Sequence, residues 1–235
     1  MKNLRETEIV DTGSLKRRWA TYVTGIYILT LGVSLAIRAG IGISPQSSLT
    51  RTMTLVYTPL SQGTYNFILE LIMLLLTYLV LPKAFKLKNF AGLIPAFVLA
   101  LFLDMNLMLT KFIVLHEYTS KFCMLAFADA FIAFGLFLMI RANLVLMPID
   151  QFVNTIYKHW GWKWGNIKTT FDCTLLLISA GIGLTFFGEP KFIREGTIVN
   201  AILIGQYIKL YFYIFKKFET KKFPYHSDPL KDMSK

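Results

Sequence analysis

Two short segments, each bounded by an arginine and a proline, contain the residue types best suited to bind a small charged molecule. One runs from Arg38 to Pro45 and the other from Arg141 to Pro148. A guanidinium offers a planar fork of donors, and a helix that begins after proline exposes free N–H groups with partial positive charge. Such ends suit an anionic or zwitterionic group. The alternative is that each arginine extends to lipid head groups and each segment is only a connection.

Prolines and polar side chains mark the two expected helix starts. Ser44, Pro45 and Ser47 lie at the first, and Pro148 and Asp150 lie at the second. Proline is favoured at the first position of a helix, where a missing N–H costs nothing. We therefore take all five as candidate substrate-binding residues. The first segment has no acid where the second has Asp150.

Four acids fall inside apolar stretches: Glu70, Asp104, Asp129 and Asp172. Charges at membrane depth are costly and usually face the interior of a helix bundle. Lys168 precedes Asp172 by one helical turn, so these two could neutralise each other. Glu70, Asp104 and Asp172 join the candidate substrate-binding residues. The sequence leaves open whether each acid carries a proton or ion, or only bridges helices through hydrogen bonds.

Long uncharged stretches show that these residues belong to a membrane protein. Hydrophobic residues make up 54% of the 235 residues and charged residues 17%. No charge occurs from Trp19 to Ile37, a stretch about long enough to cross a bilayer core. Six membrane helices are expected at about 19–38, 63–81, 90–110, 121–141, 165–187 and 196–215, with short re-entrant or interfacial helices at about 46–57 and 149–159.

Several function classes are disfavoured. The net charge of +11 comes from basic residues at helix ends and in the tail, which does not favour nucleic acid as a partner. Two cysteines and three scattered histidines lack the spacing of a metal site. No phosphate-binding loop, zinc-protease motif or nucleophile elbow is present. We therefore expect no enzyme activity, no catalytic residue, no metal and no cofactor.

The two polar segments belong to an internal repeat. Residues 32–45 and 135–148 align at a constant offset of 103, with matched Gly, Leu, Ile-Arg-Ala and Pro. Gly63 and Gly165 then open a helix in each half, and Glu70 and Asp172 follow seven residues later. Each copy contains three crossings, so the second enters the membrane from the opposite side. We expect an all-α membrane protein with two inverted three-helix repeats, at 18–114 and 120–215.

The charged residues also predict the orientation. Lysine and arginine gather before the first membrane helix, between the second and third, between the fourth and fifth, and after the sixth. The positive-inside rule places these regions, together with the N-terminal segment 1–17 and the basic tail 216–235, in the cytoplasm.

Several of these motifs resemble the YczE/YitT-like family of bacterial membrane proteins. The first half carries Ala-Gly-Ile-Gly-Ile-Ser-Pro at 39–45 and Phe-Leu-Asp at 102–104, and the second carries Met-Pro-Ile-Asp at 147–150 and Arg-Glu-Gly-Thr at 194–197. The resemblance covers about 15–215. It implies a multi-pass protein of the bacterial plasma membrane and supplies no substrate.

Our first hypothesis is a small secondary transporter or exporter of a small charged or amphipathic molecule held between the two polar segments. The second is a non-transporting accessory or scaffold protein of a membrane complex. The expected partners are the lipid bilayer and an unidentified small-molecule substrate. The sequence also leaves open a homo-oligomer or a membrane partner protein.

Overall fold

The computed structural model describes residues 13–222, except 81, 84 and 86, and these residues form helices without any strand. The α-helices are α1 (Leu15–Ala39), α2 (Pro45–Val56), α3 (Gln62–Val80), α4 (Leu93–Leu109), α5 (Tyr118–Ala142), α6 (Pro148–Trp160), α7 (Trp164–Phe187) and α8 (Glu195–Lys222). A 3-10 helix, η2 (Leu87–Gly92), precedes α4. The all-α prediction is confirmed, and six of these helices are long and apolar enough to cross a membrane. The outer parts of the predicted N-terminal segment and basic tail, 1–12 and 223–235, lie outside the described residues.

Local sequence explains how each polar segment interrupts the chain. α1 ends at Gly40 and α5 at Asn143, and both residues adopt the left-handed conformation, with φ of 69° and 45°. Glycine and asparagine are the residues that most readily adopt this helix-ending conformation. Pro45 and Pro148 then occupy the first positions of α2 and α6. The matched sequences thus produce the same helix end, extended segment and short helix in both halves.

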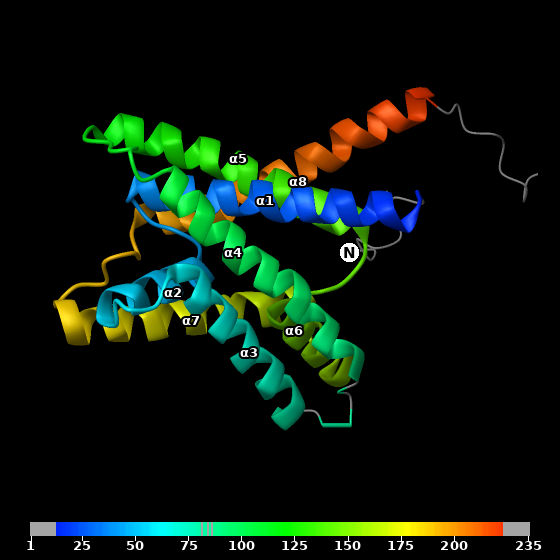
Figure 1. The fold of residues 1–235 in the computed structure, drawn as a ribbon, viewed down its shortest axis with the longest axis horizontal. Helices are drawn as coiled ribbons and strands as arrows, with labels where there is room; N and C mark the ends of the chain where they lie inside the picture. Colours follow the sequence, from blue (N-terminus) through cyan, green and yellow to red (C-terminus); the bar gives the residue numbers. More distant parts are fainter. Residues whose placement is uncertain (1–12, 81, 84, 86, 223–235) are drawn as a thin grey trace, which may run out of the picture.

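The eight helices form two groups (Figure 1). α1 packs along α5, α4 packs on α1, and α8 packs on α5. In the second group α2 packs on α7 and α3, and α6 packs on α3 and α7. α4 crosses diagonally toward the second group and packs on α3. Each short helix therefore lies against the second membrane-spanning helix of both halves, α3 and α7.

Small side chains allow the central α1–α5 contact. Ala36, Ala39 and Ala128 are fully or almost fully buried, and they pack with Leu35 and Ile132 in one apolar cluster. Membrane helices associate through such close packing because lipid is as apolar as their own side chains. This pair forms a common support, and the short helices α2 and α6 belong to the other group, with α3 and α7.

Candidate functional site

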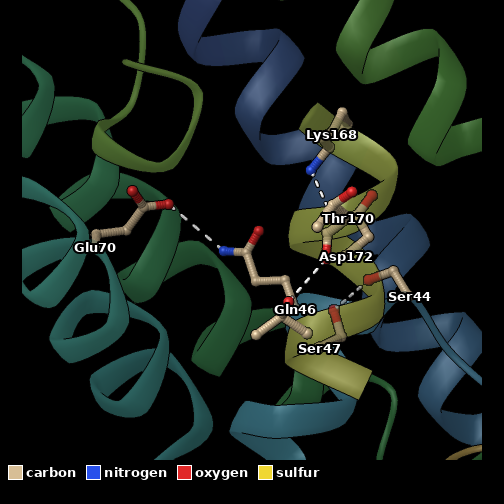
Figure 2. Close-up of polar contacts among 8 residues, drawn as sticks. Ser44, Gln46, Ser47, Glu70, Lys168, Thr170 and Asp172 are labelled. Carbon is tan, nitrogen blue, oxygen red and sulfur yellow. Dashed lines mark hydrogen bonds and ion pairs between the residues drawn. The ribbon is translucent and has the colours of Figure 1, made fainter. Parts of the chain in front are cut away.

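Glu70 in α3 accepts hydrogen bonds from both short helices. Its Oε2 accepts the backbone N–H of Ile149 in α6 at 3.0 Å. Its Oε1 accepts the side-chain amide of Gln46 in α2 at 3.5 Å (Figure 2). Both donors belong to the second residue of their helix, and they lie at the 103-residue offset of the repeat. Because helix N-termini favour negative charge, the 1%-exposed Glu70 holds two such ends together.

Asn66 lies one turn before Glu70 and extends this cluster. Its Oδ1 accepts the Gln46 amide at 2.9 Å. Its Nδ2 is buried and has no hydrogen-bond partner in the structure. Buried donors without partners are rare in folded proteins, so this amide is suited to a ligand or an ordered water. Nearby, the hydroxyl of Ser44 donates to that of Ser47 at 3.0 Å, at the start of α2.

Asp172, the acid of the second half that matches Glu70, has a partner in its own helix. Asp172 in α7 accepts a hydrogen bond from Lys168 at 2.8 Å, and about 30% of each side chain is exposed. Asp150 in α6 is an exposed residue, yet desolvation of its carboxyl group raises the pKa of that group. The positive charge of Lys168 lowers this pKa, and the negative charge of Asp172 raises it further. Glu70, Asp150 and Asp172 therefore share their surroundings with one ammonium group. The cluster contains more acid than base.

Tyr22 connects the central helix pair to this cluster. Its hydroxyl donates to the carbonyl oxygen of Val145 at 2.6 Å, in the segment that leads into α6. Beside that segment is an open hollow of about 720 Å³. Its lining comes from η2, the α5–α6 connection and α6, and it consists of Asn89, Ala91, Leu144, Val145, Leu146, Gln151, Asn154, Thr155, Lys158 and His159. The hollow thus reaches Gln151, the neighbour of Asp150.

The structure places each arginine against the last helix of its own half. Arg38 does not reach Glu70: its Nη2 donates to the carbonyl oxygen of Leu107 at 2.7 Å, at the C-terminal end of α4. Carbonyls at a helix end attract cations, so this contact satisfies the guanidinium within its own half. The Arg141 guanidinium lies 5.5 Å from the ring centre of Phe215 in α8, whereas the Asp172 carboxylate accepts Lys168. Both arginines thus contact the last helix of their half.

The other two acids of the apolar stretches, the partly buried Asp104 and the buried Asp129, join neighbouring helices. Asp104 in α4 accepts the backbone N–H of Gly63 at 2.7 Å, at the start of α3. Asp129 in α5 accepts the side-chain amide of Asn200 in α8 at 2.7 Å, and both residues are almost completely buried. These bonds agree with the bridging alternative that the sequence left open. Neither acid contacts the cluster around Glu70 through a hydrogen bond that we observe.

Sequence reasoning missed Gln46 and Tyr22. Gln46 had a usable signal, because it follows Pro45 at the start of a short helix and aligns with Ile149. Tyr22 had none, since a tyrosine near the end of a membrane helix is typical of the interfacial aromatic belt. Among the described residues, no group of three or more His, Cys, Asp or Glu side chains is arranged to hold a metal ion.

Comparison with known proteins assigns the chain to a family. A family of unknown function, DUF6198, matches residues 16–213. The chain belongs to this family. It is also similar to the uncharacterized membrane protein YczE of Bacillus subtilis, with 27% identity over 190 residues that cover 80% of this chain and 82% of that protein. The resemblance to YczE-like membrane proteins is thereby confirmed, and the chain is an integral membrane protein of this kind. No solved structure matches it.

Proposed function

We propose that this protein is a small secondary transporter or exporter that binds a small charged or amphipathic molecule where α2 and α6 meet. The observation that carries the proposal is the pair of bonds from Gln46 and Ile149 to Glu70. Secondary transporters bind substrate near the bilayer midplane, between repeats, at the ends of interrupted helices. Glu70, Asp150 and the unpartnered Nδ2 of Asn66 are the groups available to a substrate there.

We further propose that the two halves form an inverted repeat. Helix contacts support it, because α1–α4 matches α5–α8, α2–α3 matches α6–α7, and α2–α7 matches α3–α6. Two matched glycines support it as well. A Cβ at Gly92 would collide with the carbonyl of Leu146, and one at Gly196 would collide with that of Ile41. Each half thus packs the extended segment before its short helix against the glycine that opens the last helix of the other half.

The proposed orientation has both termini in the cytoplasm of a bacterial cell, by the positive-inside rule. In this orientation α3 begins outside the cell and α7 begins inside. The hollow beside α6 then opens toward the cytoplasm, because α5 and the first half of the chain bring the Leu144–Leu146 segment to that side. A substrate in this hollow would lie next to α6 before it reaches Glu70.

A thermal-shift screen of the purified protein tests the binding site. The panel contains small organic cations, anions and zwitterions, each offered at several concentrations. A ligand at one hundred times its Kd should stabilise the folded protein by about 2.7 kcal/mol. We expect this stabilisation in the parent protein and in Met108→Ala, a control at an exposed position of α4, and its loss in Glu70→Gln. An equal shift in all three proteins would place the ligand away from Glu70.

Flux of the identified ligand into proteoliposomes then tests transport itself. We expect uptake with the parent protein and Met108→Ala, and background uptake with Glu70→Gln and with protein-free vesicles. A ligand that binds at Glu70 but does not cross the membrane would overturn the transporter proposal and leave the binding site in place.

One observation favours the accessory or scaffold alternative. Only 17% of the apolar window of α7 and 6% of that of α8 is buried, against 39–44% in the other membrane-spanning helices. Ile198 and Ile202 on α8 are exposed by 68% and 58%. A photo-crosslinking residue at Ile202 should link to a second protein in cells if this face binds a partner or another copy. Linking to lipid alone would argue against the scaffold.

A further inference from the structure

We infer that Asp104 latches α3 to α4 in one half of the protein while the matching contact between α7 and α8 stands open. The two contacts would then close alternately, as outer and inner gates of the site around Glu70. This inference rests on the proposed transport function and the inverted repeat. It adds a conformational role for Asp104, which has no hydrogen bond to the proposed substrate site.

The closed contact is tight and specific. Asp104 accepts the backbone N–H of Gly63 at 2.7 Å on Oδ1, and the hydroxyl of Ser61 at 2.5 Å on Oδ2. A carboxylate that accepts free N–H groups at a helix start is a strong local contact. Gly63 also permits close approach, because a Cβ there would collide with the carbonyl oxygen of Ala100 in α4. The start of α3 therefore lies directly against the middle of α4.

The matching contact in the second half is missing. Gly165 aligns with Gly63, yet a Cβ there would meet no atom within 4 Å. α7 and α8 make at most marginal contact, whereas α3 and α4 pack extensively. By the repeat offsets, Lys163 stands where the first half has Ser61, and Ile208 stands where it has Asp104. The second half has the glycine that close packing needs but lacks the acid that holds the first half closed.

This difference predicts how the gates operate. Inverted-repeat transporters expose a central site to one side at a time by moving one bundle against the other. In the proposed orientation the Asp104 latch closes the outer side, and the gap between α7 and α8 opens the inner side. Releasing the latch should let α7 pack on α8 at Gly165. Because Gly165 has no side chain, α7 could then approach α8 as closely as α3 approaches α4 at Gly63.

Disulfide cross-linking in native membranes measures the inner gate directly. Cys123 and Cys173 are first replaced by serine, and Lys163→Cys and Ile208→Cys report the approach of α7 to α8. With Asp104 intact we expect slow cross-linking of this pair. Asp104→Ala should accelerate it about tenfold, because charged hydrogen bonds that favour the latched state are lost. Met108→Ala, an exposed neighbour on α4, should not change the rate.

Two further variants keep the test decisive if Asp104→Ala folds poorly. Ser61→Ala removes one latch bond and should accelerate cross-linking by a smaller factor. Gly165→Leu, added to either variant, should slow it again because the side chain would block the approach of α7. The inference is overturned if latch variants leave the rate unchanged, or if the pair already cross-links fast with Asp104 intact. Since no substrate is needed, a latch response without transport would refute the transporter and retain the two conformations.

Discussion

The two halves contain matching acids that form different contacts. Glu70 accepts donors from both short helices and is almost completely buried, whereas Asp172 accepts Lys168 from its own helix and is about 30% exposed. The residue one turn earlier accounts for the difference. Asn66 in the first half cannot neutralise an acid, so Glu70 stays available to donors from other helices. Lys168 in the second half supplies a cation within reach of Asp172.

The comparison shows that matching acids in the two halves can differ in role: one joins separate helices, and the other is neutralised within its own helix. A buried carboxylate must find donors, because leaving it unpaired in an apolar interior is costly. Glu70 finds them only when α2 and α6 both approach α3. The first half thus couples its acid to the arrangement of both short helices, while the second half satisfies its acid locally. The four predictions below compare the two halves, from the largest expected effect to the smallest.

The largest effect is expected for Glu70→Ala. This change leaves the N–H of Ile149 without its acceptor and leaves the Gln46 amide with Asn66 as its only acceptor, and a buried unpaired group costs about 1–3 kcal/mol. We expect the free energy of unfolding to fall by about 2–3 kcal/mol, measured by equilibrium unfolding in mixed micelles. Glu70→Gln keeps one acceptor oxygen and should lose less. A loss below that of Asp172→Ala would contradict the comparison.

A second pair of variants compares the outer helices of the two halves. α8 is joined to α5 by the bond from Asn200 to Asp129, and α4 to α1 by a bond of 2.9 Å from Asn106 to Thr30. Asp129→Leu should cost about 1–3 kcal/mol, because it leaves the buried Asn200 amide unpaired. Thr30→Val removes a neutral bond and should cost less. The same unfolding measurement ranks the two, and a larger loss for Thr30→Val would reverse the expected order.

Arginine variants test whether Arg38 and Arg141 both stabilise the contact with the last helix of their half. Arg38→Gln loses a charged bond to the end of α4 and should cost about 1–2 kcal/mol. Arg141→Gln loses its contact with the Phe215 ring, and cation–π contacts contribute about 0.5–2 kcal/mol. Thermal unfolding of both glutamine variants, and of Arg38→Lys and Arg141→Lys beside them, measures these losses of stability. If either glutamine variant keeps full stability but loses ligand binding, that arginine belongs to the substrate site instead.

The smallest effect is expected for the Lys168–Asp172 pair. Partly exposed ion pairs between neighbouring turns of a helix contribute less than about 1 kcal/mol and weaken with salt. Asp172→Ala should therefore lower the unfolding temperature only slightly, and raising the ionic strength should reduce the difference further. A loss as large as that of Glu70→Ala would show that Asp172 also holds helices together.

Much of the fold could be predicted because its signals are local. The lengths of the apolar stretches predict the six long helices. The residues after each arginine, Gly40 and Asn143, end their helices in the left-handed conformation, and the following prolines begin the short ones. These features depend on backbone preferences over a few residues, so both the matching segments and their breaks are readable without tertiary contacts.

The candidate site could be predicted only in part. Glu70 and Asp172, two of the four acids within apolar stretches, lie in shared surroundings with Asp150, a candidate from the start of the second short helix. Arg38 does not join them, because a long flexible side chain binds whichever carbonyl the neighbouring helix presents. Gln46 was overlooked, because its partner Glu70 is separated from it by 24 residues and a helix connection.

Sequence alone determined the membrane class, the helices, the two interrupted segments and the repeated order of Arg, Pro, Gly and acid, since each depends on hydrophobicity or on short-range backbone sterics. Only the tertiary structure decided which acid meets which donor. Glu70 reaches Ile149 across 79 residues and Asp104 reaches Gly63 across 41. Such contacts depend on how whole helices pack, and packing depends on the shapes of many side chains at once. For the same reason, the packed α3–α4 contact and the open α7–α8 contact cannot be distinguished by their matching glycines.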